Sequence, residues 1–259
     1  MISIDKLTKR YGATTILKDI SLDIADGEVL GLIGPSGSGK STLLRCVNFL
    51  ETFESGTLTV AGETVGYRMH GGQRVRKPAS EINAMRASCA MVFQQYNLFL
   101  HMTALQNVAV APIKVKGESK DVATARAAQL LDKVGLSHRK DAYPSAMSGG
   151  EQQRVAIARA LAMQPKALLL DEITSALDPE RALEVVDVVS GLAAEGMTMI
   201  VVTHQMEFAR KVCHRVAFLE GGDLVETGGR ELLGAPRTVR LARFLQNMHG
   251  GEPAHAPAA

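Results

Sequence analysis

The stretch Gly34-Pro35-Ser36-Gly37-Ser38-Gly39-Lys40-Ser41-Thr42 decides how the rest of this chain is interpreted. It fits the pattern G-x-x-x-x-G-K-[ST] at every fixed position. An apolar segment at 28–33 predicts a buried strand before it, and the segment at 42–47 predicts a helix after it. Glycines allow backbone N–H groups to face one concavity, and a helix N-terminus adds partial positive charge there. The stretch therefore predicts a loop that binds nucleotide phosphates, and a Gly/Ser-rich turn without a ligand is the alternative.

Two side chains of this stretch have distinct expected tasks. Lys40 would contact the β- and γ-phosphates of a nucleoside triphosphate, and the Ser41 hydroxyl would hold Mg²⁺. The whole stretch from Gly34 to Thr42 is expected to line the nucleotide site. A phosphate loop alone predicts only that the chain binds a nucleoside triphosphate, so other stretches must narrow the function.

The composition of the 259-residue chain is that of an ordinary globular protein, with 46% hydrophobic and 22% charged residues. A net charge of +2 gives no basic footprint for nucleic acid. The sequence contains no apolar run of about 18 residues, the length a membrane-spanning helix needs, and its first residues lack the layout of a signal peptide. Cys46, Cys89 and Cys213 show no metal-binding spacing and predict buried thiols in a reducing cytosol.

Hydrophobic patterns predict an α/β core with a small antiparallel sheet on one side. Alternating segments at 18–24 and 56–60 are typical of half-buried antiparallel strands. Short apolar runs predict further strands at 90–93, 167–171 and 198–203. Gly221-Gly222 predicts a two-residue hairpin between strands at 215–220 and 223–226.

The remaining segments predict a helical insertion, a loop and a tail. Residues 95–162 have helical character and predict a subdomain inserted into a core of residues 1–94 and 163–249, all within a single domain over 1–249. The basic segment 61–80 shows no clear period and predicts an irregular surface loop. It is either a solvated face or a contact for acidic lipid headgroups or a partner. Residues 250–259 predict a disordered tail.

Two acidic residues follow the predicted strand at 167–171 where it ends. Asp171 is placed to hold Mg²⁺, and Glu172 is placed to take a proton from the water that attacks the γ-phosphate. An Asp-Glu pair is also a common strand end. Its position after a phosphate loop favours the catalytic interpretation.

A second candidate anion site is Ser148-Gly149-Gly150, which precedes a long predicted helix. Backbone N–H groups and the helix dipole can bind phosphate there without a lysine. Ser148 is equally expected to be an ordinary helix N-cap. A site built on a single phosphate loop does not require a second phosphate clamp of this kind.

With these motifs the sequence resembles the ATP-binding subunits of ABC transporters over nearly the whole chain. The resemblance implies an α/β fold, a P-loop NTPase (RecA-like) core with an antiparallel β subdomain and an inserted α-helical subdomain. Ser148-Gly149-Gly150 looks like the ABC signature, which in the family closes over ATP held by the other subunit of a head-to-tail dimer. Met147 replaces the family's usual Leu, and Glu151 stands where Gln is frequent.

The resemblance also assigns expected roles to four further residues. Gln94 looks like the glutamine that binds Mg²⁺ and water, and His204 like the histidine that contacts the γ-phosphate and positions Glu172. Asp178 looks like the aspartate of the loop that lines the partner's site. Tyr11 looks like the aromatic residue that stacks on adenine. Without this context, His204 would be interpreted as a structural residue and Tyr11 as a surface residue. The sequence departs from the family pattern at Ile173, which replaces the usual Pro.

Three stretches resemble the importers for polar amino acids, namely 92–103, 111–114 and 202–209. Leu100 replaces the usual Pro there and Gln205 the usual Glu, which leaves the cargo open to opines and ectoine-like solutes. The branch implies ATP and Mg²⁺ as cofactors, a homodimer or pseudo-dimer, and a membrane permease that contacts residues near 96–103. It also implies an indirect solute-binding partner, no nucleic acid, and a peripheral location at the cytoplasmic face of the inner membrane.

Other ABC-type machines are the competing interpretation. SMC-type proteins carry a long coiled coil between the phosphate loop and the signature, whereas residues 43–147 show no sustained heptads. Translation factors of this type carry two cassettes per chain, and this sequence has one. A soluble assembly machine stays open at this point. A cassette that only binds ATP is disfavoured because every catalytic position is filled.

Overall fold

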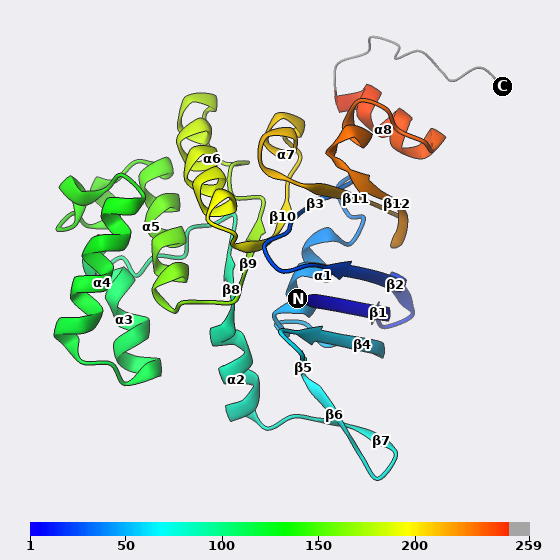
Figure 1. Cartoon of the computed structure of the whole chain (residues 1–259), viewed down its shortest axis with the longest axis horizontal. Coiled ribbons are helices and arrows are strands. Elements are labelled where there is room, and N and C mark those ends of the chain that lie inside the picture. Colours follow the sequence, from blue (N-terminus) through cyan, green and yellow to red (C-terminus); the bar gives the residue numbers. More distant parts are fainter. Residues whose placement is uncertain (249–259) are drawn as a thin grey trace.

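Six strands form the central sheet in the computed structural model, which describes residues 1–248 (Figure 1). Their spatial order is β12 (Asp223–Gly229), β11 (Arg215–Glu220), β3 (Val29–Ile33), β10 (Thr198–Val202), β9 (Ala167–Asp171) and β8 (Cys89–Val92). All neighbours are parallel except the β11–β12 hairpin. Every residue of β3, β9 and β10 is buried. Strands covered on both faces need such continuous apolar runs, which is why the sequence shows no alternation there.

A smaller antiparallel sheet lies beside the central one. It consists, in spatial order, of β2 (Thr14–Ile24), β1 (Ile2–Tyr11), β4 (Ser55–Val60) and β5 (Glu63–Thr64). Ile20, Leu22 and Ile24 of β2 are buried and alternate with exposed residues, as a sheet with one solvated face requires. The buried face packs on α1 (Lys40–Val47), which thus lies between the two sheets (Figure 1).

Alternate residues of the central strands serve two separate cores. Leu30 and Leu32 of β3 join the core shared with α1 and the antiparallel sheet. Val29 and Ile33 join the other core, on the opposite face. Helices that contribute buried residues to that second core are α3 (Ala104–Lys116), α4 (Lys120–Lys133), α5 (Gly149–Ala162), α6 (Pro179–Ala194), α7 (Met206–Val212) and α8 (Val239–Met248). Among residues 1–248, no helix combines the length and hydropathy needed to cross a membrane.

The helices α3, α4 and α5 form a group at one side of the molecule (Figure 1). Thr103, Ser119 and Ser148 cap their N-termini through side-chain oxygens, which explains where each helix begins. The short 3₁₀ helices η1 (Ser137–Arg139) and η2 (Pro144–Ala146) connect α4 to α5, and η3 (Arg230–Leu233) precedes α8. Arg159 of α5 donates hydrogen bonds to the carbonyls of Asn97 (2.7 Å) and Tyr96 (3.1 Å). These bonds tie α5 to the segment that leads from β8 into the helical group.

The prediction of an irregular loop over 61–80 is wrong. These residues form β5, then a hairpin of β6 (Tyr67–His70) and β7 (Gln73–Arg76), and the start of α2 (Ala79–Ser88), a helix that the sequence interpretation missed. Gly71 and Gly72 have φ of 57° and 77°, the conformation of a two-residue hairpin turn. The predicted tail, 250–259, lies outside the described residues.

Cations packed on aromatic rings explain why the hairpin escaped the hydrophobic pattern. The Arg74 guanidinium lies 3.7 Å from the ring centroid of Tyr67 and 4.5 Å from that of Phe53. It also donates a hydrogen bond of 2.6 Å to the Glu54 carbonyl. An arginine here performs the packing that an apolar residue usually performs in a strand. The basic composition of this segment is therefore partly structural.

Gly66 permits the contact between this segment and the aromatic cluster. It has φ of +71°, and a Cβ at this position would lie 1.9 Å from Cε2 of the buried Phe49. We expect Gly66→Ala to lower the free energy of unfolding by about 2–4 kcal/mol, since it adds a steric clash to backbone strain. Gly62→Ala is the matched control, because Gly62 has φ of +82° with nothing within 4 Å. Urea unfolding measures both, and equal losses would contradict the role of the Phe49 contact.

Candidate nucleotide-binding site

The loop between β3 and α1 packs so closely against neighbouring strands that two of its positions require glycine. Gly34 has φ of +147°, and a Cβ there would lie 2.0 Å from the Leu219 carbonyl oxygen. Gly39 has φ of +103°, and its Cβ would lie 2.7 Å from Cδ2 of Leu17. Residues 34–39 form the loop, and Lys40, Ser41 and Thr42 begin α1. The loop backbone is thus fixed by the strands around it before any ligand arrives.

Lys40 turns its ammonium group back over this loop. Nζ donates hydrogen bonds to the carbonyls of Gly34 (2.8 Å) and Pro35 (2.9 Å). Burial lowers the pKa of Lys40, while the carboxylates of Glu172 and Asp171 favour its charged form. In the part of the chain that the structure describes, the buried Ser38 hydroxyl has no hydrogen-bond partner. A loop that holds both an ammonium group and a buried hydroxyl without a partner fits a phosphate ligand.

Ser41 and Asp171 meet across 130 residues of sequence. Ser41 Oγ donates a hydrogen bond of 2.7 Å to Asp171 Oδ1, at the end of β9. Burial raises the pKa of Asp171, although the hydrogen bond from Ser41 opposes the shift. Magnesium in nucleotide sites is commonly held by one or two protein oxygens together with phosphates and water. The hydroxyl and carboxylate present here fit such an ion.

Glu172 and His204 form the third part of the site. His204 Nε2 lies 2.6 Å from Glu172 Oε1, and the Glu172 N–H donates a 3.0 Å hydrogen bond to the Val202 carbonyl. Glu172 has φ of +50°, a conformation that costs about 1–2 kcal/mol outside glycine. The hydrogen bond to Val202 fixes the backbone of Glu172, and the contact with His204 fixes its carboxylate. Strain of this kind at a strand end is typical of functional positions.

The other predicted site residues do not join this group. Within residues 1–248, no hydrogen bond or ion pair connects Gln94, Ser148 or Asp178 to the loop. Gln94 is exposed after β8. Ser148 accepts from the Glu151 N–H, and Asp178 accepts from the Arg181 N–H, so each caps its own helix. Gly149 and Gly150, in the first turn of α5, also lie outside the group.

Tyr11, which is 47% exposed, has one ring face near a cation that the sequence interpretation missed. Lys9 Nζ lies 4.6 Å from the ring centroid and 3.4 Å from the Glu51 carboxylate. Burial raises the pKa of Tyr11, and a hydrogen bond with Glu51 adds to the shift. Residues at i and i+2 of a strand share a face, which was the one available indication that Lys9 adjoins Tyr11.

Comparisons with known proteins identify the family of the chain. Residues 17–175 match the family model described as ABC transporter. The chain belongs to the ABC transporter family. An arginine transport ATP-binding protein, ArgV of Corynebacterium glutamicum, is 49% identical over 249 residues, covering 96% of this chain and 98% of its own. The glutamine transport ATP-binding protein GlnQ of Escherichia coli K12 is also 49% identical, covering 96% and 100%.

Solved structures of ABC cassettes confirm the predicted fold class. A dimeric post-hydrolysis structure of the cassette MJ0796, bound to ADP and Pi, has a TM-score of 0.76 at 32% identity, covering 89% of this chain and 99% of that one. CbiO1 of Clostridium perfringens, part of the complex cbiONQ, has a TM-score of 0.79 at 28% identity, covering 95% and 94%. The roles of individual site residues stay predictions.

Asp171→Asn tests whether the pair formed with Ser41 holds a metal ion. The amide can still accept the Ser41 hydroxyl but carries no charge, so we expect the gain in ATP affinity on adding Mg²⁺ to shrink by roughly tenfold or more. Titration with a fluorescent ATP analogue, with Mg²⁺ and with a chelator, measures this gain. Asp223→Asn, at an exposed ion pair with Lys18, is the control. An unchanged gain in Asp171→Asn would exclude Asp171 as a ligand.

Proposed function

We propose that this chain is the ATP-hydrolysing subunit of an importer for an amino acid or an amino-acid-like solute. The observation that carries the proposal is the convergence of Lys40, Ser41, Asp171, Glu172 and His204 at one edge of the sheet. Relatives at 46–50% identity over nearly the full chain are named as transport proteins for arginine, glutamine, arginine/ornithine and octopine. Those names favour an importer over a soluble assembly machine.

In the proposed reaction, the loop N–H groups and Lys40 hold the phosphates of ATP. Ser41 and Asp171 would hold Mg²⁺, with Gln94 as a further ligand once it approaches, and the ion would neutralise phosphate charge when bound. Glu172 accepts a proton from the attacking water as that water bonds to the γ-phosphorus atom, while the bond from this phosphorus to the bridging oxygen breaks and ADP leaves. His204 keeps the carboxylate aligned through the 2.6 Å contact and faces the γ-phosphate. Tyr11 offers its open ring face to adenine.

A second subunit would complete the site. Among the described residues, Ser148, Gly149 and Gly150 make no hydrogen bond with the loop of their own chain. The N–H groups of Gly149 and Gly150 lie in the first turn of α5, where backbone N–H groups have no partner within the helix. A Cβ at Gly149 would lie 2.5 Å from the Tyr96 hydroxyl and 3.0 Å from Cδ2 of Leu177, so a larger residue there would require these side chains to shift. In a head-to-tail dimer these groups and Asp178 would meet ATP held by the partner. The relative MJ0796, described as dimeric with ADP and Pi, supports this arrangement.

A groove of about 440 Å³ is the proposed contact for the membrane permease. Its lining comes from the turn after α1, from α2, from β8 and the segment that follows it, and from α3 and α5. It includes Leu50, Arg86, Phe99 and Arg159. We propose that residues 95–162 form a subdomain that moves against the core. A permease segment in this groove would then touch both the stretch after Gln94 and the helix that carries the signature. The subunit would be peripheral, on the cytoplasmic side, and a separate binding protein would supply the solute.

The role of Glu172 has a sharp kinetic test. We expect Glu172→Gln to bind ATP normally and to lose turnover by at least about 100-fold, because general-base catalysis contributes roughly 10²–10⁴-fold. ATP should then hold the variant as a dimer. Phosphate release and light scattering with and without ATP measure the two effects. Glu207→Gln, at an exposed side chain of α7, is the control, and normal turnover in Glu172→Gln would remove Glu172 from this role.

Copurification tests the importer itself. We expect the tagged protein, extracted from its own cells in mild detergent, to bring a polytopic permease with it. Leu50→Asp places a charge in the groove wall, where Leu50 is 43% exposed, and should reduce the recovered permease at least fivefold. Val122→Asp, at an exposed position of α4 outside that groove, should recover it fully. If only soluble proteins copurify, even after crosslinking, the result would contradict the proposal that the chain belongs to an importer. It would not contradict the proposal that the chain hydrolyses ATP.

A further inference from the structure

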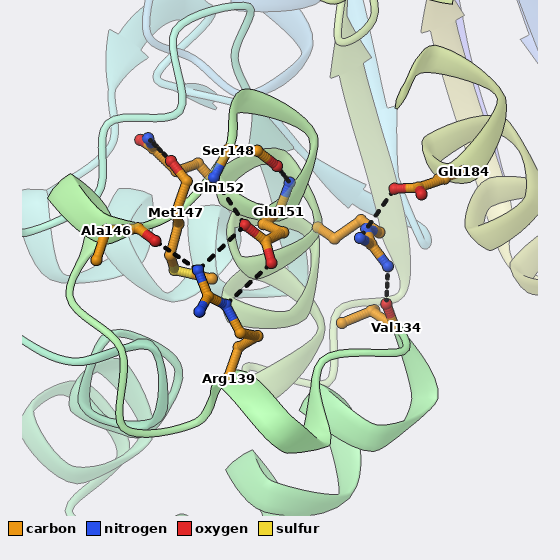
Figure 2. Close-up of polar contacts among 9 residues, drawn as sticks. Val134, Arg139, Ala146, Met147, Ser148, Glu151, Gln152 and Glu184 are labelled. Atoms are coloured by element: carbon orange, nitrogen blue, oxygen red, sulfur yellow. Dashed lines mark hydrogen bonds and ion pairs between the residues drawn. The ribbon is translucent and has the colours of Figure 1, made fainter. Parts of the chain in front are cut away.

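An arginine from the connection between α4 and α5 reaches the signature segment (Figure 2). Arg139, at the end of η1, places Nε 3.0 Å from Glu151 Oε1 and Nη2 3.5 Å from Glu151 Oε2. Its Nη2 also donates a hydrogen bond to the Ala146 carbonyl. Arg139 therefore holds the chain on both sides of Ser148. Neither Arg139 nor its contacts were anticipated from the sequence.

Glu151 connects this arginine to the backbone of the signature. Its Oε2 accepts a 2.7 Å hydrogen bond from the Ser148 N–H, and its own N–H donates to Ser148 Oγ at 3.3 Å. This reciprocal pair is a capping box. Gln152 Nε2 donates to the Met147 carbonyl at 3.1 Å, which fixes the preceding residue as well. The segment that leads into α5 is thus fixed by side chains of its own chain.

The charge of Glu151 gives the arginine a second task. Burial raises the pKa of Glu151, but the Ser148 N–H and the Arg139 guanidinium outweigh this effect and hold the pKa below its ordinary value. Glu151 is therefore ionised at neutral pH. An uncompensated carboxylate at the first turn of α5 would repel a phosphate approaching the same helix end. The guanidinium of Arg139 compensates the charge of the Glu151 carboxylate at this helix end.

The side chain of a neighbouring arginine, Arg154, also forms hydrogen bonds to other segments of the chain but, among the described residues, none to the segment around Ser148. Arg154 of α5 donates hydrogen bonds to the Val134 carbonyl (3.0 Å) and to the carboxylate of Glu184 of α6 (2.9 Å). These contacts lie one turn further along α5 and do not involve Ser148. Arg154 therefore fixes the helix as a body, whereas Arg139 fixes the segment at its start.

We propose that Arg139 and Glu151 are positioning residues for the nucleotide of the partner subunit. The pair fixes the Gly149 and Gly150 N–H groups and cancels the carboxylate charge beside them, so that the signature can close over a triphosphate bound to another chain. The inference rests on the proposed function. Groups that must meet a ligand across an interface gain from being fixed beforehand, because less freedom is lost when the ligand arrives.

The test compares Arg139→Met, Glu151→Gln and the double variant in the full-length chain. ATP-driven dimerisation is measured in the Glu172→Gln background, and kcat and KM are measured with Glu172 present. We expect Arg139→Met to weaken dimerisation and kcat/KM roughly tenfold, while ADP affinity, which needs only the chain's own loop, stays within about twofold. Adding Glu151→Gln to Arg139→Met should restore at least about threefold, because the uncompensated charge is gone while the cap acceptor remains.

Arg126→Met is the matched control. Arg126 pairs with Glu118 at 2.8 Å, and their side chains are 23% and 20% exposed, close to the 32% and 18% of Arg139 and Glu151. Its variant should lower the melting temperature without changing dimerisation. Arg139→Lys, which keeps the charge, should fall between wild type and Arg139→Met and provides a second variant if the latter fails to fold.

Three results would overturn the inference while the proposed function stands. These are wild-type dimerisation in Arg139→Met, no recovery in the double variant, or Arg139→Lys as impaired as Arg139→Met at an unchanged melting temperature. Equal losses in Arg126→Met would also overturn it, because any broken ion pair would then suffice. A wild-type chain that hydrolyses no ATP would instead contradict the proposed function, whatever the variants do.

Discussion

The parallel pairing of β10 with β3 on one side and with β9 on the other brings three distant segments together. Val202 lies opposite Leu32 of β3 and opposite Asp171 of β9. Parallel strands end at the same edge of a sheet, so the residues that follow them gather there. The hydrogen bond from Ser41 to Asp171 and the contact of Glu172 with His204 both depend on this register. A slip of one residue would turn Asp171 to the other face and remove the first contact.

Features determined by short stretches were predictable from the sequence. The loop at 34–42, the buried central strands and the caps at Ser148 and Asp178 each depend on neighbouring residues, which carry their own pattern. The hairpin β6–β7 and the helix α2 were not predictable in this way. Arg74 packs on aromatic rings from outside the hairpin as well as within it, so the apolar alternation that identifies a strand is missing.

The residues of the candidate site also fall into two groups, those that a short stretch of sequence predicts and those that depend on contacts between distant segments. Residue types at strand ends predicted Lys40, Asp171 and Glu172, because the chemistry needs those groups and the topology supplies the place. The contacts of Arg139 depend on how separate segments pack, and a charged residue looks the same in sequence whether it is solvated or holds a neighbour in position. The strain at Glu172, with φ of +50°, is equally invisible because a glutamate gives no sign in the sequence of a left-handed backbone.

The split between the two groups of site residues has a thermodynamic consequence. The loop, Asp171 and Glu172 are fixed against each other inside one chain, while the signature at α5 is fixed separately by its own cap and by Arg139. A ligand shifts a conformational equilibrium only by its difference in affinity for the two states. In the proposed dimer, ATP contacts both groups only when the subunits are closed, so its binding favours closure. Loss of the γ-phosphate removes the contact to the signature, and the equilibrium returns toward the open state. Two rigid half-sites that meet only through the nucleotide can in this way convert hydrolysis into movement of a permease.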